Sequence, residues 1–388
     1  MNRTIGDRSY FQVNNYITID GSHGEGGGQI LRTALSLSLI LSKPVEIINI
    51  RRGRPKSGLQ PQHLTCVNAC RDISDAHVEG NEIVGSTQLQ FFPHVTKSGS
   101  FTFNVAEKRG SAGSTSLILQ TLLPPLIFGQ HTVRLTLMGG THVPWSPTFH
   151  YLKEVFLPVI EKMGCSVRPS IDRWGWYPIG GGVVHAEINP ASPHIPLNPP
   201  LPPFRKGGDP NPPLLKGEIG GLKGLTIEEK GRLLKIWGMS AVSNLPVSIA
   251  ERQRAEGLNS LKVLGVDTDI EVVSAPSPGK GTFFFIVAEY EGIKAGFSAL
   301  GAIGKPAEEV AREACRAFFE YHDSNGAVEP HLADQLIPYM ALADGPSSFT
   351  TTRITRHLLT NVWTVRQLMD VDIRVEGREG EWGRVIRV

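Results

Sequence analysis

Helix, strand, helix and strand follow one another three times along this 388-residue chain, beginning near residues 24, 110 and 331. Apolar residues recur at helical spacing in the longer segments and form shorter strand-like runs between them. The predicted elements are 29–41, 45–50, 60–73, 76–78 and 89–92, then 116–126, 132–138, 149–163, a strand toward 167 and 183–188, then 331–343, 349–354, 357–369 and 371–375. This order predicts an α+β protein with three repeated units.

The second and third occurrences are separated by a much longer segment than the first two, which predicts an insertion at residues 190–290. Its first part, 190–224, holds ten of the 28 prolines and six of the 42 glycines, so we interpret it as an extended or disordered loop. Beyond it we expect helices at 227–237 and 247–264 and strands at 269–273 and 282–289. The predicted core is therefore 1–189 with 291–388, and the insertion is a smaller α/β domain within the third unit.

Composition excludes several classes of protein. An apolar content of 40 % is too high for a wholly disordered chain, and the absence of a Gly-X-Y period excludes collagen. A formal charge of +2 is too small for a globally basic nucleic-acid-binding surface, so any anionic ligand must be met by a local cluster. The first residues lack the apolar core of a signal peptide, and no apolar run is long enough to span a bilayer. We therefore expect a cytoplasmic protein with no membrane partner.

The four cysteines are too few and too scattered for a secreted disulfide framework. Cys66 and Cys70 are four residues apart and could share one helix face with His63 as metal ligands. No second cysteine pair supplies the remaining ligands of a closed structural site, so we favour buried small hydrophobic side chains.

A glycine-rich run, GSHGEGGGQ, precedes the first predicted helix. It is not a Rossmann fingerprint, because Gln29 stands where Gly or Ala is required, and the segment PGKG near residue 280 is not a P-loop. Glycines before a helix nevertheless expose backbone N–H groups that suit phosphate. Glu25 lies among them, and a carboxylate beside a phosphate site usually needs a divalent cation. The alternative is a plain helix-initiating loop with an exposed Glu.

Basic residues are densest in the segment RRGRPK, where Arg51, Arg52, Arg54 and Lys56 precede Gln62 and His63. Arginine can bind phosphate through two parallel hydrogen bonds, so this cluster predicts an anion site. The alternative is a solvated basic edge.

Three further segments place polar residues near helix starts. Gln120 follows a second glycine-rich turn, GSAGS, and Asp334 with Gln335 lies in the first turn of the helix that begins HLADQL. His357 begins the helix RHLLTN, and Asn361 lies one turn later on the same face. Read alone, each of these residues is more typical of a cap, a surface position or a satisfied core amide.

Together, the segments GEGGGQILRTALSLS, IRRGRPKSGLQPQHLT, GSAGSTSLILQTLLP, GGGVV, HLADQLIPYMALA and RHLLTN resemble the RNA 3′-terminal phosphate cyclase family, in that family's order. The resemblance covers residues 17–188 and 290–377. It implies a core of three repeated units, each with two helices and a four-stranded sheet, and a smaller α/β domain inserted within the third.

The resemblance also implies an activity. Members use ATP to convert an RNA 3′-phosphate into a 2′,3′-cyclic phosphate, and the nucleophile matches His357. Attack on the α-phosphate of ATP would give an adenylyl-histidine, and transfer of AMP to the RNA would give an RNA(3′)pp(5′)A anhydride. The neighbouring 2′-OH then closes the ring and expels AMP. Such a protein is a ligase whose partners are ATP and RNA with a 3′-phosphate end.

Further roles carry over residue by residue. Glu25 matches the ligand of Mg²⁺ or Mn²⁺. Phosphate or RNA contacts are implied for Arg32, Arg51, Arg54, Gln62 and His63. An ATP pocket is implied for Gln120, Pro147, His331, Leu332, Ala333, Asp334, Gln335 and Asn361.

Some features depart from the family pattern. Many members carry Tyr at the position of His331, no role matches Arg52, and the Pro-rich stretch is not a family feature. One alternative is a non-catalytic ribosome-assembly or RNA-binding relative, although His357, Glu25 and Gln120 argue against it. A carboxyvinyl transferase, also built from α+β repeats, is the more distant alternative.

Overall fold

The structure is a computed structural model that describes residues 16–80, 82–105, 112–191 and 221–388. Across these ranges the strands form four sheets of four strands each. In spatial order, the strands of the first sheet are β1 (Ile17–Asp20), β2 (Val45–Ile48), β4 (Leu89–Phe92) and β3 (His77–Glu79), and those of the second are β5 (Gly99–Asn104), β6 (Val133–Gly139), β8 (Gly182–Asn189) and β7 (Ser166–Arg173). The third sheet consists of β9 (Thr226–Ile227), β14 (Ser347–Thr351), β16 (Gly383–Arg387) and β15 (Ile373–Gly377). The fourth consists of β11 (Asp267–Ser274), β10 (Leu233–Ser243), β12 (Gly281–Tyr290) and β13 (Lys294–Leu300).

The first three sheets share one strand order. In each, the first strand in the chain pairs parallel with the second, and the second and the third each pair antiparallel with the fourth. The fourth sheet differs, because its first strand, β10, lies between β11 and β12 rather than at an edge. Mixed α and β content is therefore confirmed, in four small sheets.

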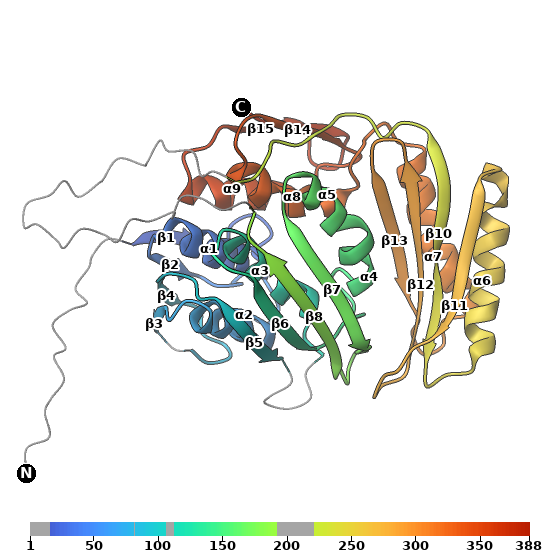
Figure 1. Ribbon diagram of the computed structural model, residues 1–388, viewed down its shortest axis with the longest axis horizontal. Helices are drawn as coiled ribbons and strands as arrows, with labels where there is room; N and C mark the ends of the chain where they lie inside the picture. Colours follow the sequence, from blue (N-terminus) through green and yellow to red (C-terminus); the bar gives the residue numbers. More distant parts are fainter. Residues whose placement is uncertain (1–15, 81, 106–111, 192–220) are drawn as a thin grey trace, which may run out of the picture.

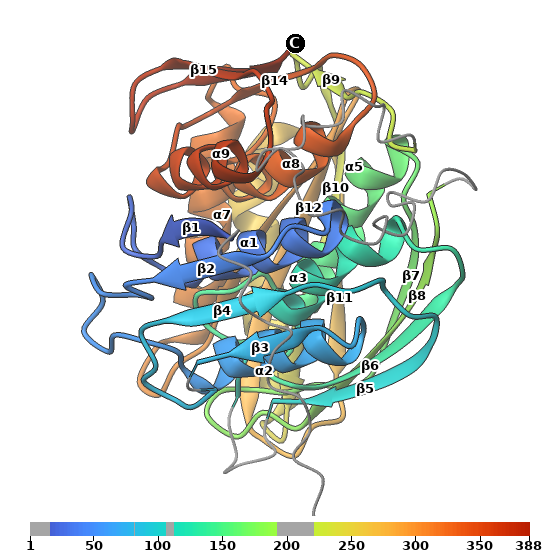
Figure 2. The same cartoon turned by 90° about the vertical axis from the view of Figure 1, so that its left-hand side faces the viewer.

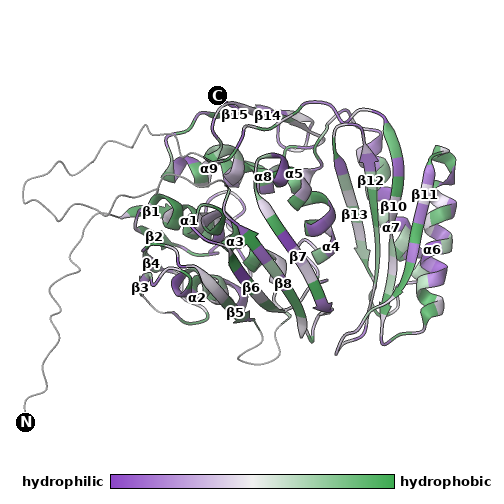
Figure 3. Cartoon of the chain, in the orientation of Figure 1, coloured by the Kyte–Doolittle hydropathy of each residue, from purple (hydrophilic) through white to green (hydrophobic). Residues whose placement is uncertain are grey.

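Helix α1 (Gly28–Leu41) lies at the centre of the molecule and is buried along most of its length. It packs against α2 (Pro61–Asp72), α3 (Thr115–Ile127) and α9 (Arg356–Leu368), and α9 in turn packs against α8 (Pro330–Leu342). Figure 2 shows α1 between α8 and α9 on one side and the first sheet with α2 on the other. A helix that is buried along most of its length must be covered by neighbouring elements, and the surrounding helices and the first sheet cover α1. Figure 3 shows α1 and α3 mostly in the hydrophobic colour.

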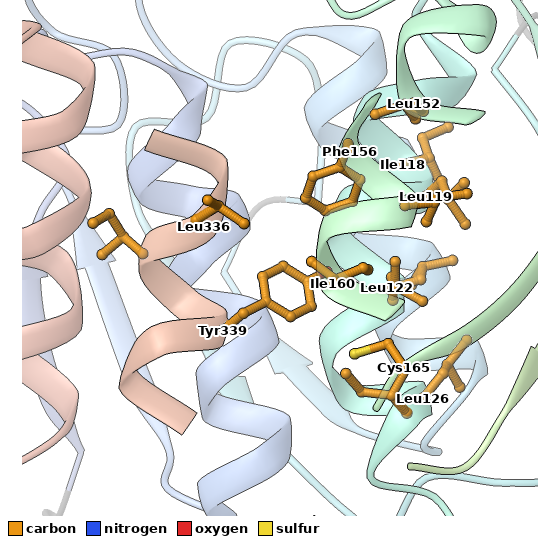
Figure 4. Packing of buried hydrophobic residues seen from close by; sticks show 14 of the residues in the cluster. Ile118, Leu119, Leu122, Leu126, Leu152, Phe156, Ile160, Cys165, Leu336 and Tyr339 are labelled. Carbon is orange, nitrogen blue, oxygen red and sulfur yellow. The ribbon is translucent and has the colours of Figure 1, made fainter. Parts of the chain in front are cut away.

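The predicted helix at 149–163 is a continuous helical run with an irregular middle. It consists of α4 (Phe149–Tyr151), a π-helical turn (Leu152–Phe156) and α5 (Leu157–Lys162). Figure 4 shows the core between this run, α3 and α8, where Phe156 and Ile160 face Leu122 and Tyr339. The predicted helices in the segments that form α1, α2, α3, α8 and α9 are confirmed, each with ends within about two residues.

The prediction of a helix at 227–237 is wrong. Thr226–Ile227 forms β9, and Leu233–Ser243 forms β10, which pairs with β11 on one side and β12 on the other. The local sequence of this run is compatible with either a helix or a strand. Pairing along both edges of β10 favours the strand.

The fourth sheet stands at one end of the molecule, with α6 (Val247–Leu261) outermost in Figure 1. Helices α6 and α7 (Ala307–His322) pack on it, so this layer continues past residue 290 to His322. Phe283 and Phe285 belong to the same hydrophobic cluster as the first three sheets. One face of the layer therefore shares a core with the rest of the protein, whereas Phe284 on the other face packs with Phe318 of α7 in a second cluster.

Three further expectations can be compared with the described residues. All four cysteines are free and buried, as interpreted from the sequence, and no group of three His, Cys, Asp or Glu in these ranges could hold a metal ion by itself. None of the helices in the described part is long and apolar enough to cross a membrane. Residues 192–220 of the Pro-rich stretch lie outside the described residues, whereas Leu222 near its end and Leu225 just after it are buried.

Candidate active site

A cleft of about 1330 Å³ lies where α1, α3, α8 and α9 meet the fourth sheet. Nearly all of the predicted site residues line this one cleft. They are Glu25, Arg32, Arg51, Arg54, Gln62, His63, Gln120, Pro147, His331, Asp334, Gln335, His357 and Asn361. Leu332 and Ala333 do not line it, since both are fully buried in the first turn of α8.

The glycine-rich turn before α1 is held against α9. Gly24 has φ +56°, and a Cβ atom there would lie 2.3 Å from Thr360 Oγ1, so the close approach requires glycine. The N–H of Glu25 donates to the same hydroxyl at 3.3 Å. His23 stacks on Trp363 of α9 with ring centroids 3.8 Å apart. These contacts fix where the Glu25 carboxylate lies relative to the start of α9.

His357 is in the first turn of α9, after the cap formed by Thr355, whose Oγ1 accepts from Leu358 N–H at 3.1 Å. His357 Nδ1 lies 2.9 Å from Gln29 Oε1, and Gln29 Nε2 donates to Asp334 Oδ2 at 3.0 Å. Because the amide nitrogen of Gln29 faces a carboxylate, its oxygen must face the imidazole, so Nδ1 of His357 is the donor. The other ring nitrogen, Nε2, is therefore the one available for reaction.

Gln29 was missed as a site residue in the sequence analysis. It stood out there only as the residue that breaks a Rossmann fingerprint. A polar side chain in the first turn of an otherwise apolar helix, directly after the glycines, is the signal that could have identified it.

The Nε2 atom of His357 lies 2.5 Å from Glu25 Oε2, and the other carboxylate oxygen contacts the Arg54 guanidinium. Burial lowers the pKa of His357, Arg32 and Arg54 lower it further, and Asp334 opposes them. The lowered pKa favours the neutral imidazole near neutral pH, in which Nε2 has a lone pair for nucleophilic attack.

Asp334 connects the imidazole to the interior. Burial raises the pKa of its carboxyl to about 6, against the opposing charges of His357 and His331. Asn361 Nδ2 donates to the Asp334 carbonyl oxygen at 2.7 Å, and Asn361 Oδ1 accepts from Thr33 Oγ1 at 2.7 Å. Asn361 thus joins α8, α9 and α1 and also lines the cleft.

The basic side of the cleft combines charged and neutral donors. Burial lowers the pKa of Arg32 and of Arg51, and Arg51 also donates to the carbonyl oxygen of Lys56 at 2.6 Å. Burial lowers the pKa of His63 to about 3, so this ring is neutral, and it accepts at Nδ1 from Gln60 N–H at 3.1 Å. Its Nε2 must then carry the hydrogen. A neutral donor beside guanidinium groups suits a phosphate oxygen.

Gln62, Gln120 and His331 also line the cleft. Gln62 Oε1 accepts from Ser114 N–H at 3.0 Å and so anchors the second glycine-rich turn, while Gln120 lies half-buried on α3. The buried carboxylate of Glu329 accepts from the N–H groups of His331 and Leu332 at 2.8 and 2.6 Å. It therefore satisfies the first turn of α8, leaving the side chains of that turn to line the cleft.

The cationic cleft with a neutral, oriented histidine defines an α+β protein suited to phosphate chemistry. The model of the family "RNA 3′-terminal phosphate cyclase" matches residues 23–375, so the chain belongs to this family. A protein of that name from Gloeothece citriformis is 40 % identical over 93 % of this chain and 97 % of its own length. Further relatives of the same name come from Pyrococcus furiosus (39 %, over 95 % and 98 %) and Methylococcus capsulatus (40 %, over 92 % and 93 %).

Proposed function

We propose that this protein uses ATP to convert the 3′-terminal phosphate of RNA into a 2′,3′-cyclic phosphodiester. The observation that carries the proposal is the geometry at His357, whose Nδ1–H is held by Gln29 at 2.9 Å while Nε2 faces Glu25 in a cleft lined by four arginines, Arg32, Arg51, Arg54 and Arg353. The names of the relatives support the same reaction. A cytoplasmic location, with free cysteines, is part of the proposal.

The first step makes a covalent nucleotide. The lone pair of His357 Nε2 forms a bond to the α-phosphorus of ATP, and the bond from that phosphorus to the bridging oxygen breaks, releasing pyrophosphate. Nδ1–H stays bonded to Gln29 Oε1, and that bond strengthens as the ring becomes positive.

The second and third steps use the activated phosphorus. An oxygen of the RNA 3′-phosphate attacks the adenylyl group, the N–P bond breaks and His357 leaves neutral, giving RNA(3′)pp(5′)A. The 2′-OH then attacks the RNA phosphorus, AMP departs and the hydroxyl proton passes to it or to water. Ring closure is fast because the hydroxyl is in the same ribose as the phosphate.

The cleft residues divide between the two substrates in this proposal. We assign RNA and phosphate contacts to Arg32, Arg51, Arg54, Gln62 and His63, and ATP contacts to Gln120, Pro147, His331, Asp334, Gln335 and Asn361. Leu332 and Ala333, being buried, hold the first turn of α8 in place rather than touching the nucleotide.

Glu25 fits a divalent cation that takes a single carboxylate ligand from the protein. It is a single carboxylate that already contacts the His357 ring and the Arg54 guanidinium. Mg²⁺ or Mn²⁺ commonly binds one or two carboxylates together with waters and substrate phosphates, and one carboxylate meets that need. A bound metal would supply charge neutralisation at the ATP phosphates. Withdrawal of Glu25 toward such a cation would leave His357 Nε2 unobstructed.

For the architecture we propose that the first three sheets are three repeats of one unit. Their common strand order supports this arrangement. The inserted domain in this proposal comprises β10 to α7, Leu233 to His322, because β9 pairs with β14 of the third sheet.

The test is retention of label. The protein is incubated with α-labelled ATP and Mg²⁺ or Mn²⁺ and then denatured, and we expect label bound through an acid-labile, base-stable linkage. His357→Ala should retain none. His185→Ala, which removes a histidine paired with Asp172 at 2.8 Å outside the cleft, should label normally. An unlabelled wild-type protein would favour the non-catalytic alternative, and labelling of His357→Ala would refute the nucleophile assignment.

A further inference from the structure

The cleft is larger than one nucleotide requires. Sites for small ligands and cofactors span about 300 to 1,000 Å³, whereas this cleft measures about 1330 Å³. It extends from Arg54 and His63 to Ser298 and Leu300 on β13 of the fourth sheet. The additional volume would accommodate a second substrate bound at the same time as ATP.

Trp145 lines this cleft with its side chain in solvent. The residue is 95 % exposed, so the indole contributes almost no buried area to the fold. Its backbone has φ +60°, a left-handed conformation that is rare and costly for a bulky residue. Val143 and Thr148 on either side are buried, so the loop is anchored while the ring projects from it. Folding does not account for a tryptophan held in this way.

Tyr177 is a second exposed ring on the same cleft. It is 64 % exposed and lies between β7 and β8, directly after Trp176, which is buried. The two rings therefore come from separate loops of the second sheet and border one cavity. Arg32, Arg51 and Arg54 line the same cavity.

We propose that Trp145 and Tyr177 form a stacking platform for the bases of the single-stranded 3′ end of RNA. Proteins that bind single strands combine a cationic groove for the backbone with aromatic rings on which bases stack. Both parts are present in this cleft. The exposure of Trp145 favours RNA over the adenine of ATP, because a strand that enters from solvent meets rings at the surface. Stacking is tolerant of sequence, so the platform would accept any terminal base. The inference rests on the proposed function.

The test separates RNA binding from ATP chemistry. Equilibrium binding of a short 3′-phosphorylated oligoribonucleotide is measured by anisotropy for wild type, Trp145→Ala, Trp145→Phe and Tyr177→Ala. A stacked base contributes roughly 1 to 3 kcal/mol, or about 5- to 150-fold in affinity. We expect a loss in that range for Trp145→Ala, a smaller loss for Tyr177→Ala and near-complete retention in Trp145→Phe. Labelling by α-labelled ATP without RNA should proceed at the wild-type rate in all three variants.

Trp382→Ala is the matched control, because Trp382 is 49 % exposed and is not among the residues that line the cleft. It should bind RNA as wild type does. Unchanged RNA affinity in Trp145→Ala would overturn the platform. An equal loss of labelling by ATP in the absence of RNA would also overturn the platform, because it would show that the Trp145 ring stacks on the adenine of ATP. A wild type that binds RNA through Trp145 but never labels with ATP would instead refute the proposed function and leave the platform standing.

Discussion

Gln29 orients His357, because the nitrogen and the oxygen of its side-chain amide contact different partners. Gln29 Nε2 is committed to Asp334 at 3.0 Å, which turns Oε1 toward the imidazole and dictates which ring nitrogen keeps its hydrogen. Without that restraint the neutral ring would interchange between two tautomers, and only one of them presents Nε2 as a nucleophile. Gln29 is thus a positioning residue for His357.

Gln29→Glu should move the pH dependence of adenylylation. A carboxylate in place of the amide would lie beside His357 Nδ1 and raise the pKa of the ring, because a nearby negative charge favours the imidazolium. We expect the acid limb of the rate profile to shift to higher pH and the rate at neutral pH to fall about 10-fold or more. Single-turnover labelling measures both. A lower rate with an unmoved acid limb would indicate structural damage instead.

The wild-type profile follows from the charges that face His357. Burial, Arg32 and Arg54 lower the pKa of the ring, whereas the negative charge of Asp334 raises it. The net direction is down from 6.5, so the reactive neutral form persists at pH 6.5 and is lost as the pH falls further. Labelling rates between about pH 5 and about pH 8 should therefore show an acid limb centred below pH 6.5. A limb centred above that value would contradict the burial argument.

At the scale of elements, the glycine-rich turn and α9 act as one unit. Gly24→Ala would place a Cβ atom 2.3 Å from Thr360 Oγ1 at a backbone φ of +56°. We expect a loss of stability of about 1 to 3 kcal/mol and slower labelling, because Glu25 and His357 move apart. Thermal or denaturant unfolding measures the first effect.

A double-mutant cycle identifies the contact responsible. Thr360→Ala removes the hydroxyl that the new methyl group would strike, so Gly24→Ala should cost less in that background. Gly53→Ala is the matched control, since nothing lies within 4 Å of a Cβ atom there. Strictly additive effects at Gly24 and Thr360 would show that the strain lies in the backbone alone.

Sequence predicted the elements whose signals are local. The helix α1 follows from apolar spacing and the glycines before it, and β4 was predicted with the bounds Leu89–Phe92. The strand β10 was mistaken for a helix because its identity depends on pairing with β11 and β12. Gln29 was missed for a similar reason, since its partners Asp334 and His357 lie 305 and 328 residues away. Nor does the sequence around Trp145 reveal that its ring is exposed.

At the scale of the whole molecule, the walls of the cleft come from distant parts of the chain that pack in a common hydrophobic cluster. Phe283 and Phe285 from the fourth sheet pack in the same cluster as Ile30 of α1 and Leu358 of α9. Trp174, which directly follows β7, stacks against His142, and the ring of Phe283 meets that histidine edge-on. Burial lowers the pKa of His142, so this junction stays uncharged and apolar. The wall that carries β13 is therefore fixed relative to His357.

The segment between the second and third sheets can be shortened only within certain limits. A Cβ atom on Gly221 would lie 2.8 Å from the carbonyl oxygen of Ala191, so the two ends of the segment 192–220 are adjacent. A short linker can therefore join them without moving either. Leu222 and Leu225 are buried, Lys223 forms a β-bridge with Asp344, and β9 begins at Thr226. The part from Gly221 onward belongs to the third sheet.

A variant in which residues 192–220 are replaced by about six Gly and Ser residues should keep its stability within about 1 kcal/mol of wild type. It should also keep both labelling and cyclisation. The longer deletion of 190–224, which follows the boundary predicted from sequence, removes Leu222 and the bridge of Lys223 and should unfold at clearly lower denaturant concentration. Denaturant midpoints and single-turnover assays on both variants decide the matter. Labelling without cyclisation in the shorter deletion would show instead that residues 192–220 take part in handling RNA.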